Sequence, residues 1–309
     1  MTDVPCSLLE FQRRFPDDAA CAAWLVEQRW PDGFRCPACG HDRAFALRTK
    51  AFTFECAACR HQTSVTAGTV MHGSKLKLVV WFWAAYLMAT HSNGISALQL
   101  QKQLGLGSYK SAWLLCHKLR RAMVAPERTL LAGLVEVDET TIPCRSREDP
   151  PTGGGGRSHQ GKLLLAGAVE LDGEGRPGRA RLRQIPDFSA KTLHAFLRDT
   201  LEPGATARTD GWAGYPGAPD VAHDPHPVGP MAAHIVLPWV HRLFANLKRW
   251  ALGVYHGLRG KHLQAYLDEF IFRFNRRRNR HAAFRTLIGI ALTRKPLTYK
   301  MLISPEAEG

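Results

Sequence analysis

Hydrophobic positions in residues 6–30 recur at the three- and four-residue spacing of an amphipathic helix. The apolar members of this pattern are Leu8, Leu9, Phe11, Phe15, Cys21, Trp24 and Leu25. The run Pro16-Asp17-Asp18 favours a helix start inside this segment, and Pro31-Asp32-Gly33 favours a stop and a turn after it. The pattern therefore predicts one or two helices at the beginning of the chain.

Residues 75–125 also follow a helical pattern. An apolar helix is predicted over 76–89, and two further helices over 96–104 and 108–123, each opened by a serine that suits an N-cap. The glycine-containing turn at 105–107 between them is typical of a helix-turn-helix. The basic residues expected to contact DNA from this element are Lys110, Lys118, Arg120 and Arg121. The alternative is an ordinary helical bundle with a solvated basic face.

Beyond Pro126 the hydrophobic period changes to that of strands. A glycine- and proline-rich loop at 145–161 lacks the Lys-Ser or Lys-Thr of a phosphate-binding loop. The pattern predicts three strands, over 134–142, 162–171 and 179–185. A helix over 189–201 and a strand over 205–212 follow, and then an irregular loop over 219–238 and a helix over 237–250. This order matches a mixed sheet of the ribonuclease H type.

Four of the eight cysteines follow the pattern C-x2-C-x16-C-x2-C. They are Cys36, Cys39, Cys56 and Cys59. Two such pairs can supply the four thiolates of a closed structural zinc site, so we predict a zinc ribbon at about 33–66. The alternatives are a redox dithiol or incidental cysteines. The remaining cysteines are scattered, which favours a reduced, cytoplasmic protein.

The chain has 309 residues and a net charge of +14, which favours a polyanionic partner such as DNA. A merely basic soluble protein is the alternative. No apolar run of about 18 residues is present, so no membrane span is expected. Residues 1–5 lack the basic and apolar regions of a signal peptide, and none is expected.

Two acids lie at or near the ends of predicted strands and are candidate ligands of a divalent metal. They are Asp138 and Asp210. Hard cations such as Mg²⁺ prefer oxygen ligands, and paired ions assist phosphodiester cleavage and joining. The alternative is that each aspartate only forms a turn or a helix cap. This alternative is serious for Asp210, because Gly211 follows it.

His241 precedes Lys248 by seven residues in a predicted helix, which places both on one face. Lys248 would then hold a DNA phosphate while His241 contacts a metal ion. A packed or surface histidine is the alternative. His223, Asp224, His226 and His234 lie in the proline-rich loop, where no separate metal site is expected.

The chain resembles the zinc-ribbon branch of the bacterial insertion-sequence transposases, which belong to the DDE superfamily and have a ribonuclease H-like catalytic domain. The resemblance covers nearly the whole chain and is carried by the four cysteines and by the runs 135–140, 209–212, 240–257 and 266–277. It implies that Asp138 and Asp210 bind Mg²⁺ or Mn²⁺ and that His241 stands where many relatives carry Glu. Imidazole is a softer ligand that suits Mn²⁺ better than Mg²⁺. An oxygen of Asn246, Glu139 or Glu269 is an alternative third ligand.

The expected organisation has N-terminal helices and the ribbon in 1–72, the helix-turn-helix-like region in 73–127, the ribonuclease H-like catalytic domain in 128–290 and a tail in 291–309. Further DNA contacts are expected from Lys248, Arg249, Arg276 and Arg277. For the last two, a solvated cationic helix end is the alternative.

The resemblance implies a transposase that cuts and joins DNA. Its partners would be the terminal inverted repeats of the element, target DNA and further copies of itself, in a dimer or larger assembly associated with the bacterial nucleoid. Two alternatives are open. One is a catalytically inactive DNA-binding regulator, motivated by His241, and the other is a metal-dependent nuclease without joining activity.

Overall fold

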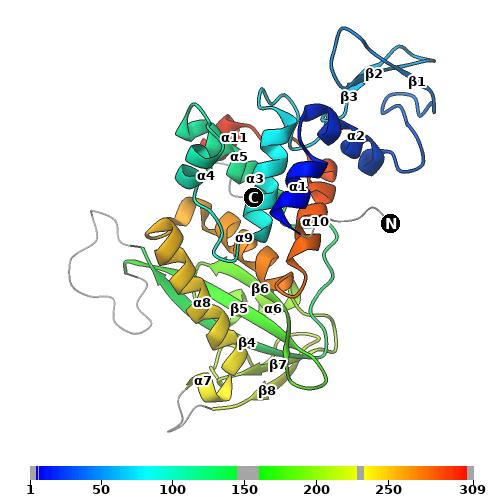
Figure 1. Cartoon of the computed structure of the whole chain (residues 1–309). Helices are drawn as coiled ribbons and strands as arrows, with labels where there is room; N and C mark the ends of the chain where they lie inside the picture. The colour runs from blue at the N-terminus through cyan, green and yellow to red at the C-terminus, as the bar shows by residue number, and fades with distance from the viewer. Residues whose placement is uncertain (1–4, 6, 145–159, 228–232, 305–309) are drawn as a thin grey trace. The chain divides into compact units, whose positions relative to one another are not determined.

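The computed structural model describes residues 5, 7–144, 160–227 and 233–304, which form two compact units (Figure 1). Unit 1 combines Met1–Ala125 with Asn279–Gly309, and unit 2 is Pro126–Arg278. The loop predicted at 145–161 falls almost entirely outside the described residues. None of the helices in the described part of the chain combines the length and the apolar character that a membrane span requires.

Unit 1 is mainly helical, as predicted. Its helices are α1 (Leu8–Arg14), α2 (Asp18–Arg29), α3 (Leu78–Thr90), α4 (Ala97–Gln103), α5 (Tyr109–Arg121), α10 (Arg280–Thr293) and α11 (Tyr299–Ile303). The predicted caps are confirmed, because the hydroxyls of Ser96 and Ser108 accept hydrogen bonds from Gln99 N and Ser111 N. Gly105 ends α4 with a φ of +60°, a conformation that glycine adopts without strain. Two helices joined by a glycine-containing turn are therefore present where the sequence predicts them.

Aromatic side chains form the core of unit 1. The ring of Phe284 from α10 lies 5.2 Å from Phe11 and 5.6 Å from Phe82, centroid to centroid. Trp24 of α2 lies 5.6 Å from Phe82 and 5.9 Å from Phe284. A helix near the C-terminal end of the chain thus completes the core that the N-terminal helices begin.

The zinc ribbon is a three-stranded antiparallel sheet of β1 (Ala44–Ala46), β2 (Thr53–Cys56) and β3 (Gln62–Ser64). Arg29 at the end of α2 fastens it to the helices. Its guanidinium donates to the carbonyls of Ser64, Val65 and Ala67 at 3.2, 2.8 and 2.6 Å. The planar fork of an arginine suits this multiple bonding.

Unit 2 contains a five-stranded mixed sheet with the order β6-β5-β4-β7-β8. The strands are β4 (Leu134–Pro143), β5 (Lys162–Leu171), β6 (Pro177–Ile185), β7 (Thr206–Thr209) and β8 (Ala222–Pro225). β5 runs antiparallel to both β4 and β6, whereas β7 runs parallel to β4 and β8 parallel to β7. This confirms the predicted mixed sheet.

The segment 219–238 is not the irregular loop that the sequence predicted. It contains the edge strand β8 and the short helix α7 (Ala233–Val236). Only four residues of β8 pair with β7, too few for a hydrophobic period to show in the sequence. Pro225 is tolerated because it ends an edge strand.

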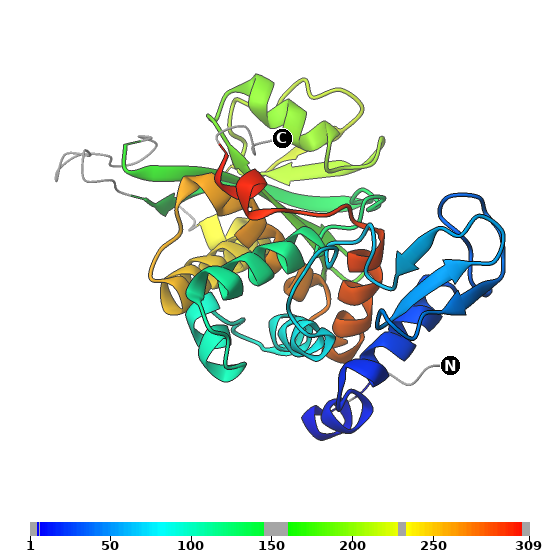
Figure 2. The ribbon, with the colours of Figure 1, turned by 90° about the horizontal axis from the view of Figure 1, so that it is seen from above.

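Helices cover both faces of the sheet (Figures 1 and 2). One face packs against α8 (Pro238–Tyr255) and α9 (Leu263–Asn275), the latter preceded by the 3-10 turn η1 (Gly260–His262). The other face packs against α6 (Ala190–Arg198). Because side chains alternate along a strand, Val135 and Val137 of β4 enter the core on the α6 side, while Glu136 and Asp138 point to the α8 side.

Helix α9 also closes the outer edge of the sheet. The amide of Asn275 accepts from Ala180 N at 2.8 Å and donates to Ala180 O at 3.2 Å. Gln264 accepts from Gln184 N at 3.0 Å and donates to Leu182 O at 3.2 Å. These side chains satisfy the backbone groups that an edge strand would otherwise offer to another chain.

Candidate functional site

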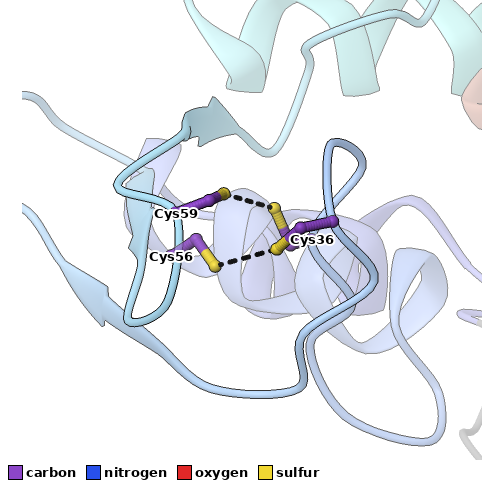
Figure 3. Close-up of side chains that lie close together, drawn as sticks. Cys36, Cys56 and Cys59 are labelled. Carbon is purple, nitrogen blue, oxygen red and sulfur yellow. Dashed lines mark hydrogen bonds between the residues drawn. The ribbon is translucent and has the colours of Figure 1, made fainter.

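The four predicted zinc ligands come together at the ribbon. Their sulfur atoms all lie within 4.8 Å of one another. The Cys36–Cys59 and Cys39–Cys56 sulfur pairs are each 3.6 Å apart (Figure 3). A tetrahedral ion with Zn–S bonds of about 2.3 Å would hold its sulfurs about 3.8 Å apart, so the group fits a closed structural zinc site.

Two matching turns present these sulfurs. Gly40 N donates to Cys36 O, and Arg60 N donates to Cys56 O. Both donors lie in the left-handed region, with φ of +74° for Gly40 and +63° for Arg60. The two C-x-x-C segments therefore fold as equivalent knuckles, and only the first uses the glycine that this conformation favours.

Asp138 and His241, more than one hundred residues apart in the chain, meet on the α8 face of the sheet. His241 Nε2 lies 3.2 Å from Asp138 Oδ2. The other carboxylate oxygen of Asp138 accepts from Glu139 N at 2.7 Å. Asp138 is buried, with 7% of its surface exposed, so an ionised carboxylate there needs a positively charged partner.

Asp210 follows the last residue of β7. The parallel register sets Arg208 beside Glu136, and Asp210 and Asp138 each follow two residues later in the chain. Asp210 Oδ1 accepts from Trp212 N at 3.0 Å. The turn role considered in the sequence is thus present, and it engages only one of the two carboxylate oxygens.

Tyr215, which the sequence analysis did not single out, lies in the core on the α6 side of the sheet, and the acids influence it electrostatically. Its side chain is buried, with 1% exposed. Burial raises its pKa well above the usual value, and the negative charges of Glu139, Asp138 and Asp210 raise that pKa further. Three carboxylates therefore act on one phenol. No motif around Tyr215 signals this, because the proximity arises from the fold.

Lys248 lies two helical turns after His241 on α8, on the same face. Desolvation by neighbouring protein atoms lowers the pKa of its amine, although the side chain is exposed, and the negative charge of Asp138 raises that pKa. The charge of Asp138 therefore acts on this ammonium group.

The donor set suits a hard divalent cation. Two carboxylates supply oxygen atoms, and the 3.2 Å between Asp138 and His241 is close to the separation of about 3.0 Å between adjacent ligands of an octahedral ion with bonds of about 2.1 Å. Among the described residues, the four cysteines form the only group of three or more ligand atoms within 4.8 Å of one another. Asp138, Asp210 and His241 therefore do not together form such a group in this structure.

Glu269, one of the alternative third ligands, lies elsewhere. It is fully buried, and the hydroxyl of Tyr255 approaches its carboxylate at 3.3 Å. Tyr255 is about 21 Å from His241 along α8 at about 1.5 Å per residue. Asn246 is exposed on α8, and Glu139 belongs to the group around Tyr215.

Two of the basic residues expected to contact DNA are buried, and a third is half-buried and bonds to the sheet. Lys118 and Arg120 are buried, with 7% and 1% exposed, and Lys118 Nζ lies 5.7 Å from the ring centroid of Trp81 on α3. The guanidinium of Arg277 donates to the carbonyls of Pro177 and Gly178 in β6. The helical pattern could not predict this, because it does not show which elements cover a basic face.

The other expected DNA contacts differ in exposure. Arg276 is half-buried, with its guanidinium 3.9 Å from the ring centroid of Phe272. Lys110 is exposed and lies 3.9 Å from the ring centroid of Tyr299. The remaining exposed members are Arg121, Lys248 and Arg249.

The histidines near β8 serve the sheet. His223 Nε2 lies 2.8 Å from Thr209 Oγ1, and Asp224 joins Arg208 at 2.9 Å and His226 at 3.0 Å. The side chain of His234 falls outside the described part of the chain.

Comparison with known proteins adds two family matches. Residues 130–275 match the family described as "ISXO2-like transposase domain", and residues 16–62 match the "Transposase zinc-ribbon domain". Together the two ranges take in more than half of the chain.

One curated relative is described as "Uncharacterized protein in transposable element ISH50" from Halobacterium salinarum. It is 26% identical over 211 residues, which cover 66% of this chain and 70% of the relative. A solved structure, "Crystal structure of a pre-cleavage Mos1 transpososome", aligns with 70% of this chain and 79% of its own at 12% identity. Its TM-score of 0.29 is too low to support an argument about fold or function.

Proposed function

Because this chain belongs to the insertion-sequence transposases of the DDE type, we propose that it binds the ends of an insertion sequence and cuts and joins DNA there. The observation that carries the proposal is the contact of His241 Nε2 with Asp138 Oδ2 at 3.2 Å. It joins the helix and the strand that bear two of the expected ligands.

Asp138, Asp210 and His241 would hold Mg²⁺ or Mn²⁺. When bound, the metal would stabilise the attacking and leaving oxygens of the phosphodiester. The two carboxylates would bring negative charge to the site, and His241 would contribute a neutral nitrogen in place of a third acid. This set favours Mn²⁺ over Mg²⁺, because imidazole is a softer ligand than carboxylate.

The reaction would proceed in two displacements at phosphorus. In the first, a water oxygen forms a bond to phosphorus at the element end, and the bond to the 3′ oxygen breaks to leave a free 3′-OH. In the second, that 3′ oxygen bonds to a target phosphorus and displaces another 3′ oxygen. No covalent bond to the protein forms, and Lys248, on the same face of α8 as His241, is suited to hold a non-bridging phosphate oxygen.

The proposed DNA-binding residues are the exposed members of the expected set, Lys110, Arg121, Lys248 and Arg249. The net charge of +14 supports a polyanionic partner. We expect two or more copies of the chain to act on paired element ends. The molar mass of the protein with and without end DNA, measured by light scattering, tests this.

The function is tested with labelled duplexes that carry the DNA on either side of the coding sequence, in Mg²⁺ or Mn²⁺. Cleaved and joined products are expected from the wild type and from neither Asp138→Ala nor Asp210→Ala. Asp172→Ala is a matched control, because Asp172 lies in the hairpin turn between β5 and β6 and its carboxylate bonds within that turn.

The two alternative functions give different outcomes. DNA binding without a cut strand in either metal would favour a regulator without catalytic activity. Nicked DNA without joined product would favour a nuclease. Joined product from both aspartate variants would contradict the assignment of the two acids.

A further inference from the structure

Glu136 is a buried acid on β4 that the proposed chemistry does not use. Only 2% of its surface is exposed. Its Oε2 accepts hydrogen bonds from Trp239 N at 2.8 Å and from Val240 N at 2.9 Å. Burial raises the pKa of the carboxyl, while these two amide bonds lower it. A side chain in the sheet therefore binds the first turn of α8.

Helix α8 needs such a partner, because its own sequence supplies no cap. The N-cap residue is Leu237, which makes no side-chain capping bond. Pro238 occupies the first helical position and has no N–H. The first N–H groups that require an acceptor are those of Trp239 and Val240, and these are the groups that Glu136 binds. An acid at this place is also favoured by the helix dipole.

The same turn of α8 carries the candidate ligand. His241 follows Val240 directly, and its imidazole reaches back to Asp138 on β4. Glu136 and Asp138 lie two residues apart on the same face of that strand. Two links thus join β4 to the start of α8, one from Glu136 to the backbone and one from Asp138 to His241.

We propose that Glu136 is a positioning residue, which fixes the first turn of α8 and so keeps His241 beside Asp138 when a metal binds. The proposal rests on the proposed function, in which these two residues share an ion. Without the Glu136 link, the start of α8 has two amides without a protein acceptor and freedom to move away from β4. Such motion would weaken the metal site more than it weakens the fold, because metal ligands tolerate displacements of only about 0.2 Å.

The test measures Mn²⁺ binding by electron paramagnetic resonance on the full-length, zinc-loaded chain. Glu136→Ala is expected to weaken Mn²⁺ binding at least about tenfold, the lower end of the range for residues that orient metal ligands. Glu136→Gln keeps an acceptor oxygen and is expected to weaken it less. This smaller loss of Mn²⁺ affinity is expected if the hydrogen bonds from the backbone of α8 to residue 136 keep His241 in place.

Glu170→Gln is the matched control. Glu170 is an acid of the neighbouring strand β5 that accepts from the backbone of Ala132 at 2.9 Å and from Arg179. The control variant should lose stability to denaturant and keep the wild-type affinity for Mn²⁺. Stability is measured for every variant, and Glu136→Gln carries the test if Glu136→Ala does not fold.

The failures are distinguishable. Wild-type affinity in both Glu136 variants, together with loss of binding in Asp138→Ala, would overturn the positioning role and leave the metal site standing. Weakening in Glu170→Gln equal to that in Glu136→Gln would also overturn it, because general destabilisation would explain both. Binding that Asp138→Ala leaves unchanged would overturn the metal site and this role with it.

Discussion

The ring of Phe244 on α8 lies directly over Gly167 of β5. A Cβ atom added to Gly167 would stand 2.7 Å from Cζ of that ring, closer than real Cβ contacts come. Gly167 pairs with Asp138 across the two strands. The missing side chain therefore allows α8 to approach the sheet beside the proposed metal ligand.

Replacing Gly167 by alanine should push α8 away from β4. Overpacking of this kind should lower the free energy of unfolding by about 1–3 kcal/mol, which urea denaturation measures. DNA joining should also fall, because His241 moves away from Asp138. Gly173→Ala is the control, because nothing lies within 4 Å of its added Cβ and its φ is not left-handed. Equal stability of the two variants would show that Phe244 adjusts without moving the helix.

Restoring an acid at position 241 should keep or raise joining in Mg²⁺. His241→Glu supplies a third carboxylate, which suits the harder ion. Without metal, this carboxylate would repel Asp138, so the melting temperature should depend more strongly on Mg²⁺ than in the wild type. Thermal unfolding with and without Mg²⁺, together with the joining assay, measures both effects.

The alanine substitution decides whether His241 is a ligand. His241→Ala should lower joining by at least about tenfold, since loss of even an outer-shell partner costs about that much. If this variant matches the wild type in both Mg²⁺ and Mn²⁺, His241 does not hold the metal.

Removal of zinc should unfold the ribbon. Binding of a structural zinc contributes about 10–16 kcal/mol to the folding of small zinc domains, far more than three short strands provide alone. Cys39→Ser, or treatment with a chelator, should release the metal and expose residues 36–62 to protease, while the sheet of unit 2 stays resistant. Metal analysis and limited proteolysis measure this.

A cysteine outside the ribbon serves as the control for zinc loss. Cys144→Ser changes a half-buried cysteine in unit 2 and should keep the zinc. A ribbon that stays protease-resistant after losing its zinc would contradict the structural role.

Acid should weaken unit 2 through Glu170. Its hydrogen bond with Arg179 is the largest influence that lowers the pKa of this carboxyl. Since the folded-state pKa lies below the unfolded value of about 4.3, the stabilisation is full above that pH and is lost as pH falls through the folded-state pKa. Urea denaturation between pH 7 and pH 3 should show this loss.

Glu170→Gln should lower the free energy of unfolding by about 2 kcal/mol at neutral pH, the scale of a hydrogen bond between charged groups. The variant should also lose less stability than the wild type as the pH falls. Glu127→Gln changes an exposed acid of the same unit and should leave the pH dependence of stability unchanged. If Glu170→Gln loses as much stability as the wild type between pH 7 and pH 3, other acids dominate the pH dependence of stability.

Local features of this chain could be predicted from the sequence. Two C-x-x-C pairs determine a tetrahedral sulfur group because each pair forms its own turn. Ser96 and Ser108 set helix starts because capping depends on the next three residues. The spacing of His241 and Lys248 determined their shared face because a helix has a fixed period. The segment boundaries, including 73–127 and 291–309, stay predictions.

Only the tertiary structure decided which distant residues meet. It brought His241 to Asp138, gave the uncapped start of α8 an acceptor in Glu136, and added Tyr215 to the acids. It also buried Lys118 and Arg120, whose positions in a helical pattern looked like a DNA-binding face. The physical reason is that local patterns fix turns, caps and faces, whereas contacts between distant segments depend on how the faces pack, and no short stretch of sequence contains that information.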